Sequence, residues 1–99
     1  MFLKDSLFYA ANVEPEVARM FKAHDTGQRD VAEQFKARTV TMIDHILERK
    51  EFSVAGREEW LSIRNLVEGY DRLDAYMRRV LLAYGQPFSY KFMQRLAGF

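Results

Sequence analysis

The sequence contains no cysteine and few β-branched residues. Among its 99 residues there are only two prolines and five glycines, and valine, isoleucine and threonine are sparse. The absence of cysteine excludes disulfide bonds and thiolate metal sites, and it suits a reducing compartment. The composition favours helices over strands. Since 48% of the residues are hydrophobic, we expect one folded all-α domain over residues 1–99.

Long apolar runs and a strong net charge are also missing. No run approaches the roughly 20 residues that a membrane-spanning helix requires. The first residues lack a basic segment followed by an apolar one, so we expect no signal peptide and a cytoplasmic protein. The net charge of +1 gives the whole chain no electrostatic attraction for nucleic acid or for a membrane surface.

Motifs for catalysis and metal binding are absent as well. A di-metal site in a helical bundle needs Glu-x-x-His motifs, but neither His24 nor His45 follows a glutamate by three residues. His45 precedes Glu48 by three residues, and we interpret these two as a surface pair. There is no glycine-rich phosphate loop and no Gly-x-Ser-x-Gly nucleophile motif. We therefore expect a protein that is not an enzyme and that has no cofactor and no bound metal.

The chain does contain an apolar stripe late in the sequence, with members three or four residues apart. The members are Ile63, Leu66, Tyr70, Leu73, Met77, Val80 and Tyr84. This spacing places them on one side of a helix. Ser53 is a suitable cap before the stripe, and Gly85 with Pro87 is a suitable stop after it. The pattern therefore predicts one long helix over residues 54–84.

The rest of the chain also shows helical patterns. They predict helices over residues 3–12, from Pro15 onward, over residues 28–50 and over residues 88–97. Only three residues join helix 28–50 to helix 54–84, so these two helices form an antiparallel hairpin. The expected fold is a compact bundle of four or five helices built on this hairpin.

The two arms of the hairpin differ in expected length. At about 1.5 Å per residue, helix 54–84 spans roughly 46 Å and helix 28–50 roughly 33 Å. The shorter arm ends opposite Ala75. The apolar side chains of Met77 and Tyr84 must therefore be buried by something other than helix 28–50. The candidates are the remaining helices, a second copy of the chain in a homodimer, and a partner protein.

The C-terminal segment carries charge of one sign. Residues 77–99 contain no acidic residue, and four basic residues give this segment a charge of +4: Arg78, Arg79, Lys91 and Arg95. Aromatic residues alternate with them: Tyr84, Phe88, Tyr90, Phe92 and Phe99. Such segments bind acidic protein surfaces, nucleic acids or anionic membranes. Aromatic residues, methionine and arginine are also enriched in protein–protein interfaces.

We interpret the protein as a small non-enzymatic regulator, adaptor or inhibitor that docks onto another protein. The predicted docking site consists of Met77, Arg78, Arg79, Tyr84, Phe88, Phe92 and Arg95. One alternative is a nucleic-acid-associated regulator that uses the same basic residues. Another is that the aromatic residues belong to the core and the basic residues are solvated.

Overall fold

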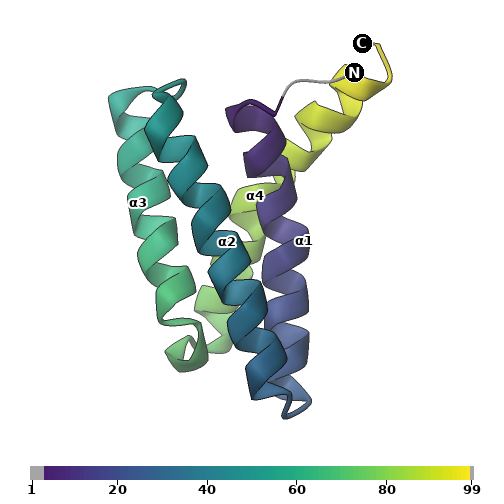
Figure 1. The fold of residues 1–99 in the computed structure, drawn as a ribbon, viewed down its shortest axis with the longest axis vertical. Helices are drawn as coiled ribbons and strands as arrows, with labels where there is room; N and C mark the ends of the chain where they lie inside the picture. The colour runs from purple at the N-terminus through teal and green to yellow at the C-terminus, as the bar shows by residue number, and fades with distance from the viewer. Residues whose placement is uncertain (1–3, 99) are drawn as a thin grey trace.

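The structure, a computed structural model, describes residues 4–98 as a helical bundle (Figure 1). Its elements in order are α1 (Ser6–Asp25), α2 (Arg29–Arg49), α3 (Val54–Glu68), the short 3-10 helix η1 (Tyr70–Arg72) and α4 (Ala75–Leu96). Successive α-helices run in opposite directions, with the reversals at alternate ends of the bundle. The expected all-α bundle is confirmed.

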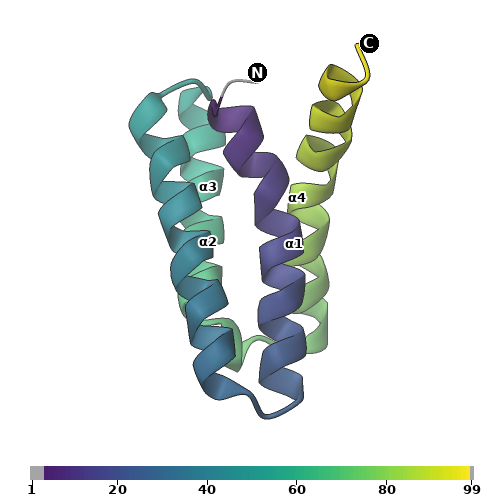
Figure 2. The same cartoon turned by 45° about the vertical axis from the view of Figure 1, so that its right-hand side comes forward.

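Helix α1 lies between α2 and α4 and packs along both (Figure 2). Its buried residues occur in almost every turn: Ser6, Ala10, Ala11, Val13, Val17, Met20, Phe21 and Ala23. Several of them are small, which lets the neighbouring helices approach closely. The core continues into α2 and α3 through the buried side chains of Ile43, Ile46 and Trp60.

The two helices expected before residue 25 are a single helix, so the predicted break at Pro15 was wrong. Leu3, the expected start, lies outside the described residues. Pro15 has no N–H group, so the carbonyl of Ala11 loses its normal helical hydrogen bond. The hydroxyl of Ser89 in α4 donates to this carbonyl at 2.9 Å. A residue far away in the sequence thus compensates the proline, which allows α1 to continue.

The predicted antiparallel hairpin is present, but its second arm is shorter than expected. Ser53 caps α3 by accepting a hydrogen bond from the Gly56 N–H at 3.1 Å. Helix α3 ends at Glu68, so the helix expected over residues 54–84 was wrong beyond that point. After η1 the chain starts a new helix, where the Asp74 carboxylate accepts a hydrogen bond from the Met77 N–H at 2.8 Å. Gly69 and Asp74 therefore end one helix and begin the next, although the apolar spacing continues across the break.

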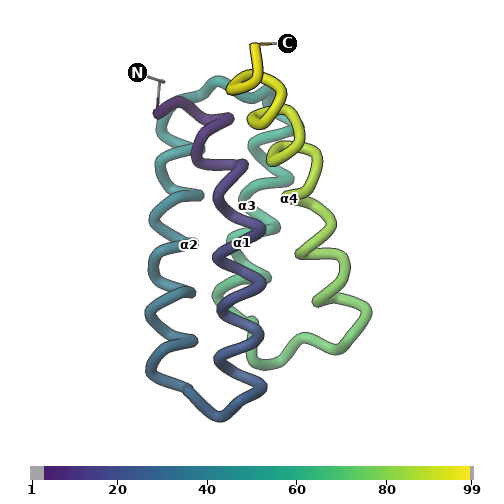
Figure 3. Tube along the Cα trace, turned by 90° about the vertical axis from the view of Figure 1, so that its right-hand side faces the viewer, coloured from purple at the N-terminus to yellow at the C-terminus, as the bar shows by residue number. Residues whose placement is uncertain are grey.

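The unequal arms that motivated the predicted docking site are absent. Helix α3 has 15 residues and is shorter than α2, which has 21. Helix α4 turns back and runs alongside α1 (Figure 3). The residues beyond Ala75 are therefore not an extension of the hairpin, and their inner side packs against the chain itself.

Gly85 lies where α4 crosses α1. It is buried in the middle of α4, so the predicted helix stop at Gly85 and the separate helix over residues 88–97 were wrong. A Cβ atom at Gly85 would lie 2.8 Å from the Glu14 Cβ and 3.2 Å from the Glu14 backbone nitrogen. Only glycine permits this approach, and the packing explains why the residue stands inside a helix.

Large aromatic side chains connect α3 with α4. The fully buried Trp60 has its ring centroid 5.0 Å from that of Tyr84 and 5.3 Å from that of Phe88. Phe52 lies beside them, with its ring 5.7 Å from Phe88. The Tyr84 hydroxyl donates a hydrogen bond to Glu59 at 2.9 Å. These side chains fill the space between the two helices and stabilise their arrangement.

Candidate interaction surface

The aromatic residues of the predicted docking site lie on the inner side of α4. Tyr84 and Phe88 belong to the aromatic cluster around Trp60. The ring of Phe92 lies 5.7 Å from the ring of Phe8 in α1. Met77 is half-buried. These four side chains face the bundle, so the fold itself uses most of their apolar surface.

Two of the predicted basic residues form ion pairs within the chain. Arg78 donates to both carboxylate oxygens of Asp25 at 2.9 Å, and its guanidinium lies 4.8 Å from the centre of the Phe21 ring. Arg95 donates to both oxygens of Asp5, at 3.1 and 3.0 Å. Arg79 differs from both, because it is exposed and has no ion pair within residues 4–98.

The Asp5–Arg95 pair joins the start of α1 to the end of α4. Partial burial disfavours the ionised carboxyl group, but hydrogen bonds from Arg95 and from the Phe8 N–H outweigh it and lower the pKa of Asp5 below its usual 3.8. A lowered pKa in the folded state stabilises the protein at neutral pH. This contribution is lost as the pH falls through the folded-state pKa.

The exposed side of α4 carries an apolar stripe that sequence reasoning missed. We define the α4 outer face as Tyr76, Val80, Ala83, Pro87 and Tyr90, which follow one another at four, three, four and three residues. All of them are exposed, with Tyr76 and Tyr90 at 64% and 68%. The three-and-four spacing could have revealed this stripe. However, Val80 had been placed on the buried stripe, because the break at residues 69–74 was not foreseen.

Exposed large hydrophobic side chains are concentrated on α4. Five of those in the described part of the chain belong to this helix: Tyr76, Val80, Tyr90, Met93 and Leu96. The other two, Val54 and Leu61, are on α3. Of these five, Tyr76, Val80 and Tyr90 lie on the α4 outer face, whereas Met93 and Leu96 lie outside it by helical geometry. Single exposed apolar residues are normal in folded proteins, whereas a group along one helix face is typical of an interaction surface.

Positive charge borders the α4 outer face. Helix α4 contains no acidic residue. Arg79 and Lys91 flank the stripe near its two ends, on opposite sides by helical geometry, and both are exposed. Neither has an ion pair among the residues that the structure describes. The surface is therefore an apolar strip with free cations at its border.

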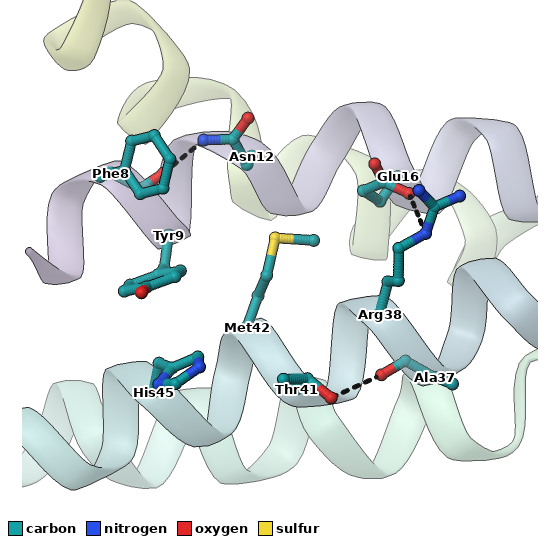
Figure 4. A pocket seen from close by; sticks show the side chains of 9 residues that line it. All are labelled: Phe8, Tyr9, Asn12, Glu16, Ala37, Arg38, Thr41, Met42 and His45. Atoms are coloured by element: carbon teal, nitrogen blue, oxygen red, sulfur yellow. Dashed lines mark hydrogen bonds and ion pairs between the residues drawn. The ribbon is translucent and has the colours of Figure 1, made fainter. Parts of the chain in front are cut away.

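A groove with a volume of about 490 Å³ opens between α1 and α2 (Figure 4). Its walls are formed by Phe8, Tyr9, Asn12, Glu16, Ala37, Arg38, Thr41, Met42 and His45. The polar side chains that line the groove form hydrogen bonds with backbone carbonyls of the same chain. The Asn12 amide donates to the Phe8 carbonyl at 2.7 Å, and the Thr41 hydroxyl donates to the Ala37 carbonyl at 3.0 Å. What remains for a ligand is mainly apolar surface.

The charged groups of the groove are also paired. Glu16 accepts a hydrogen bond from Arg19 at 3.2 Å and lies 3.8 Å from Arg38. The ring of His45 stacks on the ring of Tyr9 with 4.7 Å between the centroids. His45 also lies 3.9 Å from Glu48, with both side chains exposed, as a surface pair would. The Thr41 hydroxyl donates to a backbone carbonyl and has no hydrogen bond to His45 in the described part of the chain, so these two groove residues are not paired as a nucleophile and its base.

Within residues 4–98, no three histidine or carboxylate side chains lie close enough together to hold a metal ion. None of the helices in that range is both long and apolar enough to cross a membrane. When the chain was compared with models of protein families, with curated proteins and with solved structures, nothing matched.

Proposed function

We propose that the protein is a small non-enzymatic regulator, adaptor or inhibitor that binds another protein through α4. The supporting observation is the concentration of exposed large hydrophobic side chains on this helix. The proposed surface is the α4 outer face together with Arg79 and Lys91. It retains the C-terminal location and Arg79 of the site expected from the sequence. The aromatic residues of that site serve the fold instead.

The ion pairs favour a protein partner over the nucleic-acid alternative. Of the four basic residues in the C-terminal segment, Arg78 and Arg95 are neutralised by Asp25 and Asp5. Nucleic-acid binding rests largely on several cations that each contact a phosphate. The two free cations instead border an apolar strip, and a charged border around an apolar centre is typical of protein interfaces.

Site-specific photo-crosslinking tests this proposal. A benzophenone amino acid is placed in cells at Tyr76 or at Tyr90, the two ends of the α4 outer face, and in a third variant at Leu61. Leu61 is an exposed apolar residue on α3 and serves as the matched control. We expect Tyr76 and Tyr90 variants to form a crosslink to the same protein, and the Leu61 variant to form none.

The crosslink should also disappear when Val80→Asp is added, because an unpaired carboxylate in an apolar interface is strongly unfavourable. A crosslinked protein that appears equally at Leu61, or that survives Val80→Asp, contradicts the proposed surface. The absence of a crosslink to any protein from both α4 positions contradicts it as well.

A further inference from the structure

The α4 outer face has at its centre a backbone carbonyl that lacks its usual helical donor. Pro87 has no N–H, so it cannot donate the helical hydrogen bond to the carbonyl of Ala83. Ala83 is exposed, and no side chain in the described part of the chain donates to this carbonyl. A polar acceptor is thus located in the middle of an otherwise apolar strip.

The same defect in α1 shows how a neighbouring helix can satisfy such a group. There Pro15 leaves the Ala11 carbonyl without its helical donor. The Ser89 hydroxyl of α4 supplies the missing hydrogen bond at 2.9 Å in a partly buried position. A helix packed on the α4 outer face can satisfy the Ala83 carbonyl in the same way, with a short hydroxyl or amide side chain.

The charges at the border of the face indicate the charge of its partner. Arg79 and Lys91 are twelve residues apart, which corresponds to about 18 Å along the helix. A second copy packed through its own α4 outer face would bring the same cations and no acid from that helix, because α4 has none. Like charges facing each other across an interface are unfavourable, whereas acidic residues on both flanks of a partner are attracted.

The spacing of the face indicates the form of its partner. Side chains at alternating intervals of three and four residues form one stripe along a helix, and such a stripe is the surface with which amphipathic helices pack on each other. From Tyr76 to Tyr90 the face covers fourteen residues, or about 21 Å. Small residues lie between the two tyrosines, so a large apolar side chain of a second helix fits there.

We infer that the α4 outer face binds an acidic amphipathic helix of another protein, with a hydroxyl or amide side chain opposite the Ala83 carbonyl. This inference rests on the proposed function and specifies the chemistry of its partner. The partner helix carries acidic residues on both flanks of its apolar stripe. It spans about four turns.

Selection from a displayed peptide library tests the partner chemistry. The peptides are helices of about 15 residues with a fixed leucine stripe and with randomised flanking and central positions. We expect binders to the wild-type chain to be enriched in aspartate and glutamate on both flanks. They should bind the charge-reversed variant Arg79→Glu/Lys91→Glu roughly ten-fold more weakly. They should not bind Val80→Asp.

The outcomes separate this inference from the proposed function. Binders with neutral or basic flanks that still require Val80 overturn the acidic partner but leave the proposed surface in place. Binders that ignore Val80→Asp, or a selection without enrichment, overturn both. A dimer in solution that Val80→Asp converts to a monomer also overturns the acidic partner, because a second copy then covers the face. A shift of nucleic acid by the wild type that Arg79→Glu/Lys91→Glu abolishes overturns both as well.

A pair of matched peptides tests the hydrogen bond to Ala83. One enriched binder is made with serine and with alanine at the central position. On the wild type the serine peptide should bind about five-fold more tightly. On Pro87→Ala, whose N–H restores the helical bond to Ala83, the two peptides should bind equally. An equal serine preference on both chains contradicts a role for the Ala83 carbonyl.

Discussion

Helices α1 and α4 contain the same backbone defect in different surroundings. Each has a proline in its interior, Pro15 in α1 and Pro87 in α4, and each therefore has a carbonyl without its helical donor. In α1 the carbonyl is bonded by Ser89, because α1 is enclosed between two neighbours (Figure 2). In α4 it lies on the exposed side. Helix α4 thus differs from α1 in having one side that the fold uses and one side that the fold leaves exposed.

The largest effect is expected for the aromatic cluster on the inner side of α4. Trp60→Ala removes a fully buried side chain and leaves Tyr84 and Phe88 beside a cavity. We expect the free energy of unfolding to fall by about 3–5 kcal/mol, measured by urea denaturation followed by circular dichroism. Tyr90→Ala, an exposed aromatic on the outer side, should cost no more than about 0.5 kcal/mol. Equal losses would show that both sides of α4 are packed.

Gly85→Ala should disturb the close packing of α4 against α1. Its Cβ would meet the Glu14 Cβ at 2.8 Å and the Glu14 backbone. We expect a loss of about 1–3 kcal/mol in urea denaturation despite the higher helix propensity of alanine. Gly69→Ala is the matched control, since its Cβ would have only ordinary contacts, the nearest at 3.5 Å. A Gly85→Ala variant as stable as this control would contradict the close crossing.

Ser89→Ala tests whether the Ala11 carbonyl of α1 depends on the hydrogen bond from Ser89 of α4. Loss of the hydrogen bond to the Ala11 carbonyl should reduce the free energy of unfolding by about 1 kcal/mol. In a Pro15→Ala background the restored N–H supplies the bond, so the same substitution should cost clearly less. Thermal and urea unfolding of the four chains gives this double-mutant cycle. Identical costs in both backgrounds would show that Ser89 does not compensate Pro15.

Because the pKa values of Tyr70 and Tyr84 are raised, we expect the protein to lose stability at alkaline pH. Burial and the hydrogen bond to Glu33 raise the pKa of Tyr70 to about 12. Burial and the hydrogen bond to Glu59 also raise the pKa of Tyr84 above its ordinary value of 10.0. A pKa raised in the folded state gives stability that is complete below the unfolded-state value and is lost as the pH rises through the folded-state value.

The difference in stability between the wild type and Tyr84→Phe should therefore narrow as the pH rises above 10.0, the ordinary pKa of tyrosine. Urea denaturation at a series of alkaline pH values measures it. A difference that stays constant over this range contradicts the buried, hydrogen-bonded state of the Tyr84 hydroxyl.

Local sequence signals predicted the fold class and one hairpin correctly. The scarcity of β-branched residues and the three-and-four spacing indicated helices, and Ser53 was identified as the cap of the helix after the hairpin turn. The positions of α2 and of the start of α3 follow from these features. Such signals act over a few residues, so a single sequence is sufficient to recognise them.

The errors came from contacts between residues far apart in the sequence. Pro15 and Gly85 were taken as helix boundaries, but both lie inside helices. Ser89 bonds the carbonyl that Pro15 leaves without a donor, and the close approach of Glu14 requires a glycine at position 85. The break at Gly69 was hidden because Tyr70 and Leu73 continue the apolar spacing through it. Once α4 starts anew at Ala75, Leu81 faces inward and Val80 faces outward. The α4 outer face could not be predicted without knowing that the helix is interrupted at residues 69–74.

The division of α4 into an inner and an outer side is tested most directly by two neighbouring substitutions. Leu81 is 1% exposed and Val80 is 37% exposed, and each is replaced by aspartate. In urea denaturation, Leu81→Asp should lose about 3 kcal/mol or more, since it buries an unpaired carboxylate. Val80→Asp should lose only about 1 kcal/mol, since Val80 is partly covered by the fold but remains 37% exposed. A comparable loss of stability in both variants would contradict the division.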